Sequence, residues 1–321
     1  MVEERTQAAA AIKDVADRVK DNIGRVIVGR DEVVELALVA LLAEGHMLIE
    51  DVPGVGKTML AKAIAKSVGC SFKRIQFTPD LMPSDVTGIH YYNQKSGEFE
   101  FRPGPIIANI VLADEINRAT PRTQSALLEA MEERQVTLDG VTMPLPSPFL
   151  VLATQNPIEL EGTFPLPEAQ LDRFLMRVRV GYPDEADEDD ILLRFEAENP
   201  LDALEPVVSA DELVRLRALV PRIHCEASVR RYVIAIVQAT RRHPALELGA
   251  SPRASLALFR ASRALAAIRG RDYVLPDDIK TLAPVVLAHR LILSSQTRLR
   301  GRNTAAVLDE VLAEVAAPVE G

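Results

Sequence analysis

The sequence predicts an α/β fold: a parallel β-sheet with helices on both faces and inserted β-hairpins, followed by a small domain made of helices. Buried strand patterns alternate with helices over the first half of the chain, strand tips carry acidic or polar residues, and no strand pattern follows residue 183. We therefore expect an N-terminal helix over residues 1–22, an α/β core with two hairpin insertions over 23–183, and an all-α domain over 184–321.

Composition limits the class of protein. The chain has 321 residues, of which 48% are hydrophobic and 26% charged, enough for one large or two medium cores. A net charge of −9 argues against nucleic-acid binding driven by overall charge. Cys70 and Cys225 lack the spacing of a disulfide framework or a zinc site. The apolar runs are shorter than the ~18 residues of a membrane span and the start is unlike a signal peptide, so we expect a cytoplasmic protein.

The first elements are helical. Apolar residues recur at helical spacing over 6–22, and a second, strongly apolar helix is predicted over 33–43. Between them lies a turn that contains Val28 and Gly29. We expect this turn beside the loop that follows the first strand.

The first strand, over 46–50, leads into a glycine-bearing loop and a helix. The loop ends in Gly54-Val55-Gly56-Lys57-Thr58, the core of a P-loop. In a P-loop, amides wrap phosphates, the lysine reaches the β- and γ-phosphates, and the threonine hydroxyl binds Mg²⁺. Asp51 stands where the first glycine of the pattern usually stands. Taken alone, the segment is compatible with nucleotide binding or with a helix-capping turn.

Two later strands end in polar side chains. A buried strand over 108–115 ends in Asp114 and Glu115, and a strand over 149–154 is followed by Asn156. A further strand is predicted over 71–77. Ligands of parallel sheets lie at the carboxyl ends of the strands, so these side chains are expected to converge on a phosphate held by the loop.

Two hairpins interrupt the alternation. Residues 89–101 form two short strand patterns around a glycine turn, and residues 135–145 flank Asp139-Gly140, a strong two-residue hairpin signal. A helix over 120–134 precedes the second hairpin. The prolines in 78–84 are expected to break any regular element there.

The remainder is expected to be helical after an outer strand over 175–180. An acidic run over 183–190 suits a helix amino end, and we place the domain boundary there. Helix patterns follow over 209–220, around 229–237, from 252, from 276, and over 304–316. Arg253 lies in a first turn, where a cation is unfavourable unless an anion is near.

In this order, the P-loop, the acidic strand tip, the polar strand tip and a later arginine resemble an AAA+ ATPase, an αβα P-loop fold with a helical lid. The sequence is most similar to the MoxR family, from about residue 23 to the last helix. The segments that carry the resemblance are 50–58, 114–119, 153–157 and 169–174. An acidic residue at the position of Asp51 is common in that family.

The resemblance implies roles for individual residues. Walker A and its flanks bind ATP through Pro53, Gly54, Val55, Gly56, Lys57, Thr58 and Met59, and Val28 and Gly29 meet adenine. Thr58 and Asp114 hold Mg²⁺, mostly through water in the case of Asp114. Glu115 is the base that orients the attacking water, and Asn156 is sensor 1, which positions that water.

Two arginines complete the implied site. Arg173 resembles the arginine finger that a subunit supplies to its neighbour's ATP, which implies a ring, expected to be a hexamer. A surface salt bridge of Arg173 with Asp172 or Glu168 is the alternative. Arg253 resembles sensor 2, which reaches the γ-phosphate from the lid.

The expected function is that of a Mg²⁺-dependent ATPase that remodels a protein partner as a chaperone. The family resemblance implies a partner with a von Willebrand factor A domain and a client enzyme complex that is matured or loaded with metal. The hairpins are the candidate contact surfaces. The alternative is a nucleic-acid motor or a magnesium-chelatase-like subunit, but residues 135–148 contain no lysine or arginine, which disfavours the motor. A scaffold without turnover is disfavoured because Glu115, Asn156 and Arg173 are all present.

Overall fold

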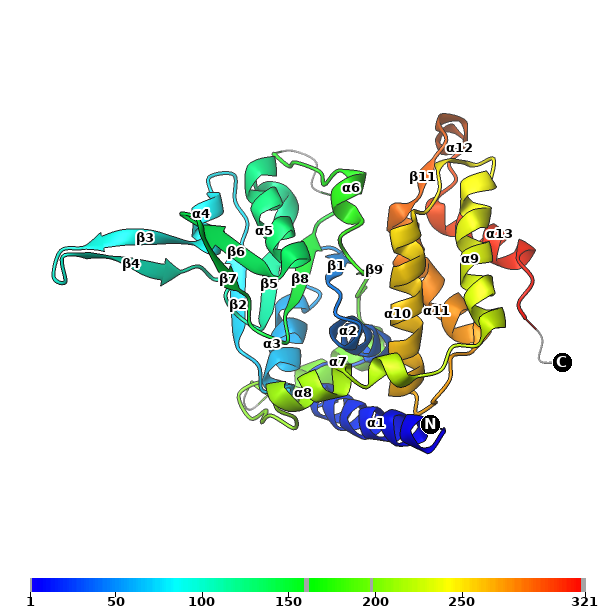
Figure 1. The fold of residues 1–321 in the computed structure, drawn as a ribbon, viewed down its shortest axis with the longest axis horizontal. Helices are drawn as coiled ribbons and strands as arrows, with labels where there is room; N and C mark the ends of the chain where they lie inside the picture. The colour runs from blue at the N-terminus through cyan, green and yellow to red at the C-terminus, as the bar shows by residue number, and fades with distance from the viewer. Residues whose placement is uncertain (1, 159–161, 197–198, 319–321) are drawn as a thin grey trace.

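The predicted parallel sheet is present in the computed structural model, which describes residues 2–158, 162–196 and 199–318 (Figure 1). Its strand order is β2-β5-β8-β1-β9, and all four pairings are parallel. The strands are β1 (Met47–Glu50), β2 (Phe72–Gln76), β5 (Ile110–Asp114), β8 (Leu150–Gln155) and β9 (Met176–Val178). This order places the carboxyl ends of β1, β5 and β8 side by side.

Alternate side chains of the strands enter two separate cores. Ile49 and Leu112 belong to a core that includes α1 (Val2–Gly24), α2 (Asp31–Leu42) and α3 (Lys57–Ser67) and continues into the carboxyl-terminal helices. Leu48 and Val111 face the opposite core, which includes α5 (Pro121–Glu133). The sheet is therefore covered on both faces, which explains why its three central strands, β1, β5 and β8, are mainly apolar runs.

Both predicted hairpins form. The first, β3 (Gly88–Asn93) with β4 (Glu98–Pro103), projects far from the body, and the second is β6 (Gln135–Leu138) with β7 (Val141–Pro144) (Figure 1). His90 Nδ1 and Asp139 Oδ2, 2.7 Å apart, join the two. The break expected from the prolines is wrong at one point: Pro83 begins the short helix α4 (Pro83–Thr87), since proline fits a first helical position.

The carboxyl-terminal part is mainly helical, as expected. Its main helices are α7 (Glu185–Arg194), α8 (Ala210–Arg217), α9 (Ala227–Arg242), α10 (Pro252–Ile268), α11 (Pro276–Leu287) and α13 (Thr304–Glu314), with α12 (Ser295–Leu299) between the last two. The expectation that this part holds no strand is wrong. β10 (Leu246–Leu248) pairs antiparallel with β11 (Ile292–Leu293), and strands of this length are too short to show alternation. No described helix is long and apolar enough to cross a membrane.

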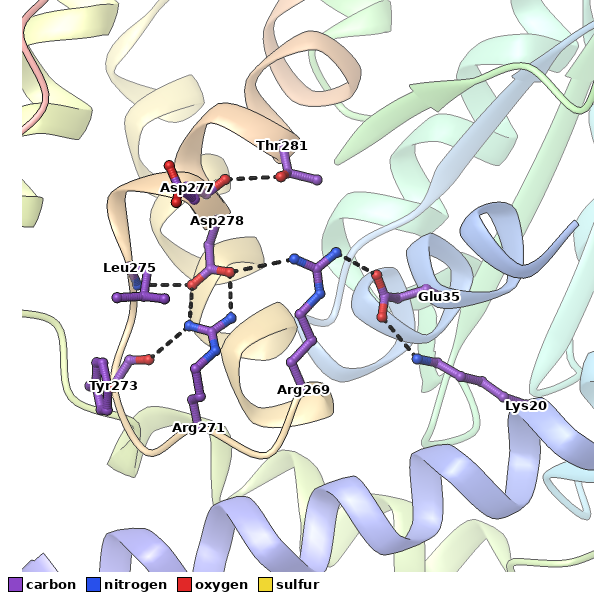
Figure 2. A network of polar contacts seen from close by, with 9 residues as sticks. All are labelled: Lys20, Glu35, Arg269, Arg271, Tyr273, Leu275, Asp277, Asp278 and Thr281. Carbon is purple, nitrogen blue, oxygen red and sulfur yellow. Dashed lines mark hydrogen bonds and ion pairs between the residues drawn. The ribbon is translucent and has the colours of Figure 1, made fainter.

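A charged network joins the first two helices to the carboxyl-terminal part (Figure 2). Glu35 of α2 pairs with Lys20 of α1 at 2.8 Å and with Arg269, which follows α10, at 2.9 Å. Arg269 also lies 3.8 Å from Asp278 of α11, and Arg271 binds both oxygens of that buried carboxylate. Burial raises the pKa of Glu35, but the hydrogen bonds from Arg269 and Lys20 outweigh burial, and the pKa is lowered overall.

The predicted domain limits stay a prediction. Their outer ends, residues 1 and 321, lie outside the described residues.

A buried histidine fixes one end of the sheet. The Nδ1 atom of His46 accepts the backbone N–H of Val151 at 3.0 Å, and its Nε2 lies 3.1 Å from the carbonyl oxygen of Met131. The ring is therefore neutral with its proton on Nε2. Burial, aided by the charge of Arg134, lowers the pKa of His46 to about 3.

His46 should make folding sensitive to acid. Above pH 6.5 neither state binds a proton here, whereas between pH 6.5 and about 3 only the unfolded state does. The free energy of unfolding should then fall by about 1.4 kcal/mol per pH unit, or about 2 kcal/mol between pH 6.5 and pH 5. Urea unfolding at several pH values should show that the free energy of unfolding depends less steeply on pH for His46→Gln than for wild type. The same pH dependence of the free energy of unfolding in His46→Gln and wild type would contradict this assignment.

Candidate nucleotide site

The loop between β1 and α3 has the geometry of a phosphate cradle. Gly54 and Gly56 adopt left-handed φ values of 89° and 84°, which favour glycine, and no heavy atom lies within 4 Å of a Cβ placed on either. The Nζ atom of Lys57 donates to the backbone carbonyls of Asp51 at 2.7 Å and Val52 at 3.1 Å. The loop thus surrounds open space at the amino end of α3, where free amides favour an anion.

Asp114 ends β5 beside this loop and is buried. Its Oδ1 accepts the hydroxyl of Thr154 at 2.5 Å, and its Oδ2 accepts the Arg74 guanidinium at 2.6 and 3.1 Å. Burial lowers the pKa of Lys57, and the carboxylates of Asp51, Asp114 and Glu115 oppose that effect. The lysine and the acidic strand tip therefore share one electrostatic environment.

Glu115 follows in the left-handed conformation, at φ 58°, which turns the chain sharply after the strand. Its backbone N–H donates to the Thr154 hydroxyl at 2.9 Å, so a single threonine orients both acids. One carboxylate oxygen, Oε2, accepts Gln76 Nε2 at 2.9 Å and lies 3.1 Å from Arg118 Nε. Glu115 is half-buried and directed along the carboxyl edge of the sheet.

The predicted phosphate-side residues line one cavity of about 440 Å³. The buried Asn156 is part of its wall, and its Oδ1 accepts the backbone N–H of Ile158 at 3.1 Å. The lining residues are Pro53, Gly54, Gly56, Lys57, Thr58, Met59, Lys62, Arg74, Asp114, Glu115, Thr154 and Asn156. The structure therefore brings the loop and the strand tips together.

A second, mainly apolar cavity of about 220 Å³ shares Gly54, Gly56 and Met59 with the first. Its other lining residues are Val26, Ile27, Val28, Arg30, Val55, Leu60, Val180, Pro183, Ile191 and Phe195. Val28 thus lies in the wall as expected. Gly29 lies against α7 instead of in this lining, because a Cβ on it would meet the Asp187 carboxylate. An apolar cavity beside a phosphate cradle suits a nucleotide base.

The residues present fit ATP and Mg²⁺. The open space above Gly54 and Gly56 would admit phosphates close to the backbone. Thr58 and Asp114 offer the hydroxyl and carboxylate oxygens that Mg²⁺ prefers, and Mg²⁺ in such sites takes its remaining ligands from phosphates and water.

Arg173 and Arg253 lie elsewhere. Glu132 of α5 holds both: its Oε2 is 3.1 Å from Arg173 Nε and its Oε1 is 3.0 Å from Arg253 Nη1. Both arginines line a separate cavity of about 340 Å³, and neither lines the two cavities described above. The two arginines therefore share one carboxylate, away from the phosphate side of their own chain.

Arg173 pairs with Glu132, in place of the alternative salt bridge with Asp172 or Glu168. Asp172 instead pairs with Arg290, a buried side chain in the short 3₁₀ helix that follows α11, at 2.6 Å. Arg290 also donates to the backbone carbonyl of Phe174 at 2.7 Å. The loop that carries Arg173 is thus fixed to the helical part of the chain.

Three residues that contact the predicted site residues were not expected from the sequence: Arg74, Thr154 and Glu132. Arg74 and Gln76 are two residues apart in a predicted strand, so their side chains lie on the same face of the sheet. Because Gln76 and Asp114 are paired in register, this alternation could have indicated that Arg74 lies on the same face as Asp114. Thr154 is the last residue of the strand predicted over 149–154 and could have been grouped with Asn156, which follows that strand. No local signal marks Glu132, which contacts residues far along the chain.

The comparisons with known proteins agree with this geometry. The family model for the ATPase family associated with various cellular activities (AAA) matches residues 46–176, and the model for the AAA lid domain matches residues 238–311. Chaperone MoxR1 of Mycobacterium tuberculosis is 45% identical over 97% of this chain and 85% of its own length. The chain belongs to the MoxR family of AAA+ ATPases.

Other members of this group cover the chain equally well. YeaC of Bacillus subtilis, an uncharacterised protein, is 55% identical over 94% of each chain. A solved structure of a presumed ATPase from Cytophaga hutchinsonii has a TM-score of 0.92 and 39% identity, and covers 99% of each chain. The similarity to this solved structure extends over the sheet, both hairpins and the carboxyl-terminal helices, and the predicted AAA+ fold with its lid is confirmed.

Proposed function

We propose that this MoxR-family ATPase hydrolyses ATP with Mg²⁺ and works as a ring that remodels a protein partner. The observation that carries the catalytic part is the convergence of Lys57, Asp114, Glu115 and Asn156 on one cavity beside an apolar pocket. Phosphoryl transfer of this kind needs positioning and charge neutralisation more than covalent groups.

Each residue has a role in this proposal. Lys57 and the loop amides hold the β- and γ-phosphates, and the pocket lined by Val28 and Ile191 takes the base. Bound Mg²⁺, held by Thr58 and Asp114, would neutralise the phosphate charge. Asn156 positions the attacking water, and Glu115 accepts its proton.

We infer that Arg173 and Arg253 act together on the ATP of a neighbouring subunit. Both lie outside the cavities of their own chain and share Glu132, which suits two cations presented as a unit at a surface. A surface that donates arginines to a neighbour's site is a head-to-tail contact, and such contacts form a ring when the rotation between neighbours closes. A hexamer is the ring that the family resemblance implies. From the sequence, Arg253 is expected to reach a γ-phosphate from the lid, and we propose that this γ-phosphate belongs to the neighbouring subunit.

The proposed partner is a protein in the cytoplasm. A close relative is named a chaperone, and the projecting hairpin β3–β4 exposes Tyr92 and Phe99, whose rings lie 5.4 Å apart. A protein with a von Willebrand factor A domain and a client enzyme complex, matured or loaded with metal, are the partner classes we propose.

The test traps the ATP-bound ring. Glu115→Gln should bind Mg-ATP without hydrolysing it and retain the partner from a lysate of the source cell. Lys57→Ala, which lacks the phosphate-binding amine, is the control, and replacement of ATP by ADP should release the partner. Recovery of a von Willebrand A-type protein or an enzyme complex supports the proposal. ATP-dependent recovery of nucleic acid would instead favour the motor, and equal recovery with Lys57→Ala would contradict ATP-driven remodelling.

A further inference from the structure

Asp51, which replaces the first glycine of the usual P-loop pattern, makes contacts that a glycine could not make. Its carboxylate accepts three backbone N–H groups: Oδ1 that of Val52 at 2.8 Å, and Oδ2 those of Val180 at 2.8 Å and Gly181 at 2.6 Å. Consecutive amides that converge on one oxygen form an anion-binding nest, which needs a left-handed residue, and Gly181 has φ 72°. Hydrogen bonds to a charged acceptor are the stronger kind.

The segment held by Asp51 belongs to the base pocket. Val180 and, a few residues later, Pro183 line that pocket, and α7 continues from them. The carbonyl of Gly181 accepts the guanidinium of Arg30 at 3.1 Å, and Arg30 lines the same pocket. The Asp51 carboxylate thus connects the phosphate loop to the wall of the pocket that contains Val180. The Gly181 carbonyl connects that wall to Arg30, another lining residue.

The backbone of Asp51 serves the phosphate side. Its carbonyl accepts an N–H of the Lys57 amine at 2.7 Å. Among the charges that favour the protonated lysine, its carboxylate has the largest effect. One residue therefore contacts the phosphate-binding lysine through its main chain and the base pocket through its side chain.

We propose that Asp51 is a positioning residue that joins the phosphate loop and the base pocket into one preorganised frame. The proposal rests on the proposed placement of the nucleotide in the two cavities. A ligand that spans both cavities gains from a fixed distance between them, because less ordering is needed on binding. A ligand that occupies only the phosphate side gains nothing from that distance.

The test compares ADP with inorganic tripolyphosphate, which has phosphates but no base. Asp51→Asn keeps the shape of the side chain but replaces one acceptor oxygen by an NH₂ donor, which then faces backbone N–H groups. Asp51→Gly restores the usual P-loop residue. Both variants should bind ADP about tenfold more weakly, the effect of about one charge-assisted hydrogen bond. They should bind tripolyphosphate no more weakly than wild type does, because the charge that is lost beside Lys57 is negative. Asp189→Asn, an exposed carboxylate on α7, is the matched control and should change neither affinity.

A second readout does not depend on ligand. Amide hydrogen exchange at Val180 and Gly181 should be faster in both Asp51 variants than in wild type, because Gly offers no side-chain acceptor and Asn offers one uncharged oxygen for the three N–H groups that Asp51 accepts. Equal weakening of ADP and tripolyphosphate would show that Asp51 only shapes the phosphate loop and would overturn the inference, as would unchanged affinity for ADP. If wild type itself fails to bind ADP, the proposed nucleotide site fails, and that outcome is distinct from a failure of Asp51 alone.

Discussion

Arg173→Ala is expected to lower the kcat of ATP hydrolysis about 10³-fold, because an arginine finger stabilises charge that develops only in the transition state. ADP affinity should change little, since Arg173 does not line the cavities of its own chain. Steady-state phosphate release and ADP titration measure the two effects. Arg231→Ala removes an exposed arginine of α9 and serves as the control for loss of charge. If Arg173 served only to pair with Glu132, its removal would leave kcat within a few-fold of wild type.

Glu115→Gln is expected to lower kcat by about 10²- to 10³-fold and to leave ATP binding intact, because an amide cannot accept the proton of the attacking water. Glutamine keeps the length of the side chain and the acceptor that Gln76 now uses. Single-turnover hydrolysis and binding of labelled ATP separate the two effects. Glu133→Gln, at the exposed end of α5, is the control. A variant that loses ATP binding along with hydrolysis would assign Glu115 to ligand binding instead of to the chemical step.

The sequence identified most of the phosphate side because its information is local. The strand that ends in Asp114 and the strand that Asn156 follows are both apolar runs, and the carboxyl ends of parallel strands meet at one edge of the sheet. The P-loop is similarly contained in consecutive residues. These parts of the fold and of the candidate site depend on few long-range contacts.

The remaining features depend on contacts between distant segments. Asp51 lies 129 and 130 residues from the amides it accepts, and no pattern near it predicts them. The pairing of Arg173 and Arg253 on Glu132 requires three segments that are distant in the sequence to meet, so spacing alone does not predict it. The strands β10 and β11 were missed because three and two residues carry no periodicity.

In the proposed ring, residues of two subunits hydrolyse each ATP. The decisive measurement mixes Arg173→Ala and Glu115→Gln subunits in equal amounts, after exchange of subunits, and records ATPase activity. A site is complete where an Arg173→Ala subunit, which keeps its own Glu115, receives Arg173 from a Glu115→Gln neighbour. In a random equal mixture each of these two conditions holds for about half of the sites, so about a quarter of wild-type activity should be restored. Activity no greater than the mean of the two variants measured separately would contradict a shared site.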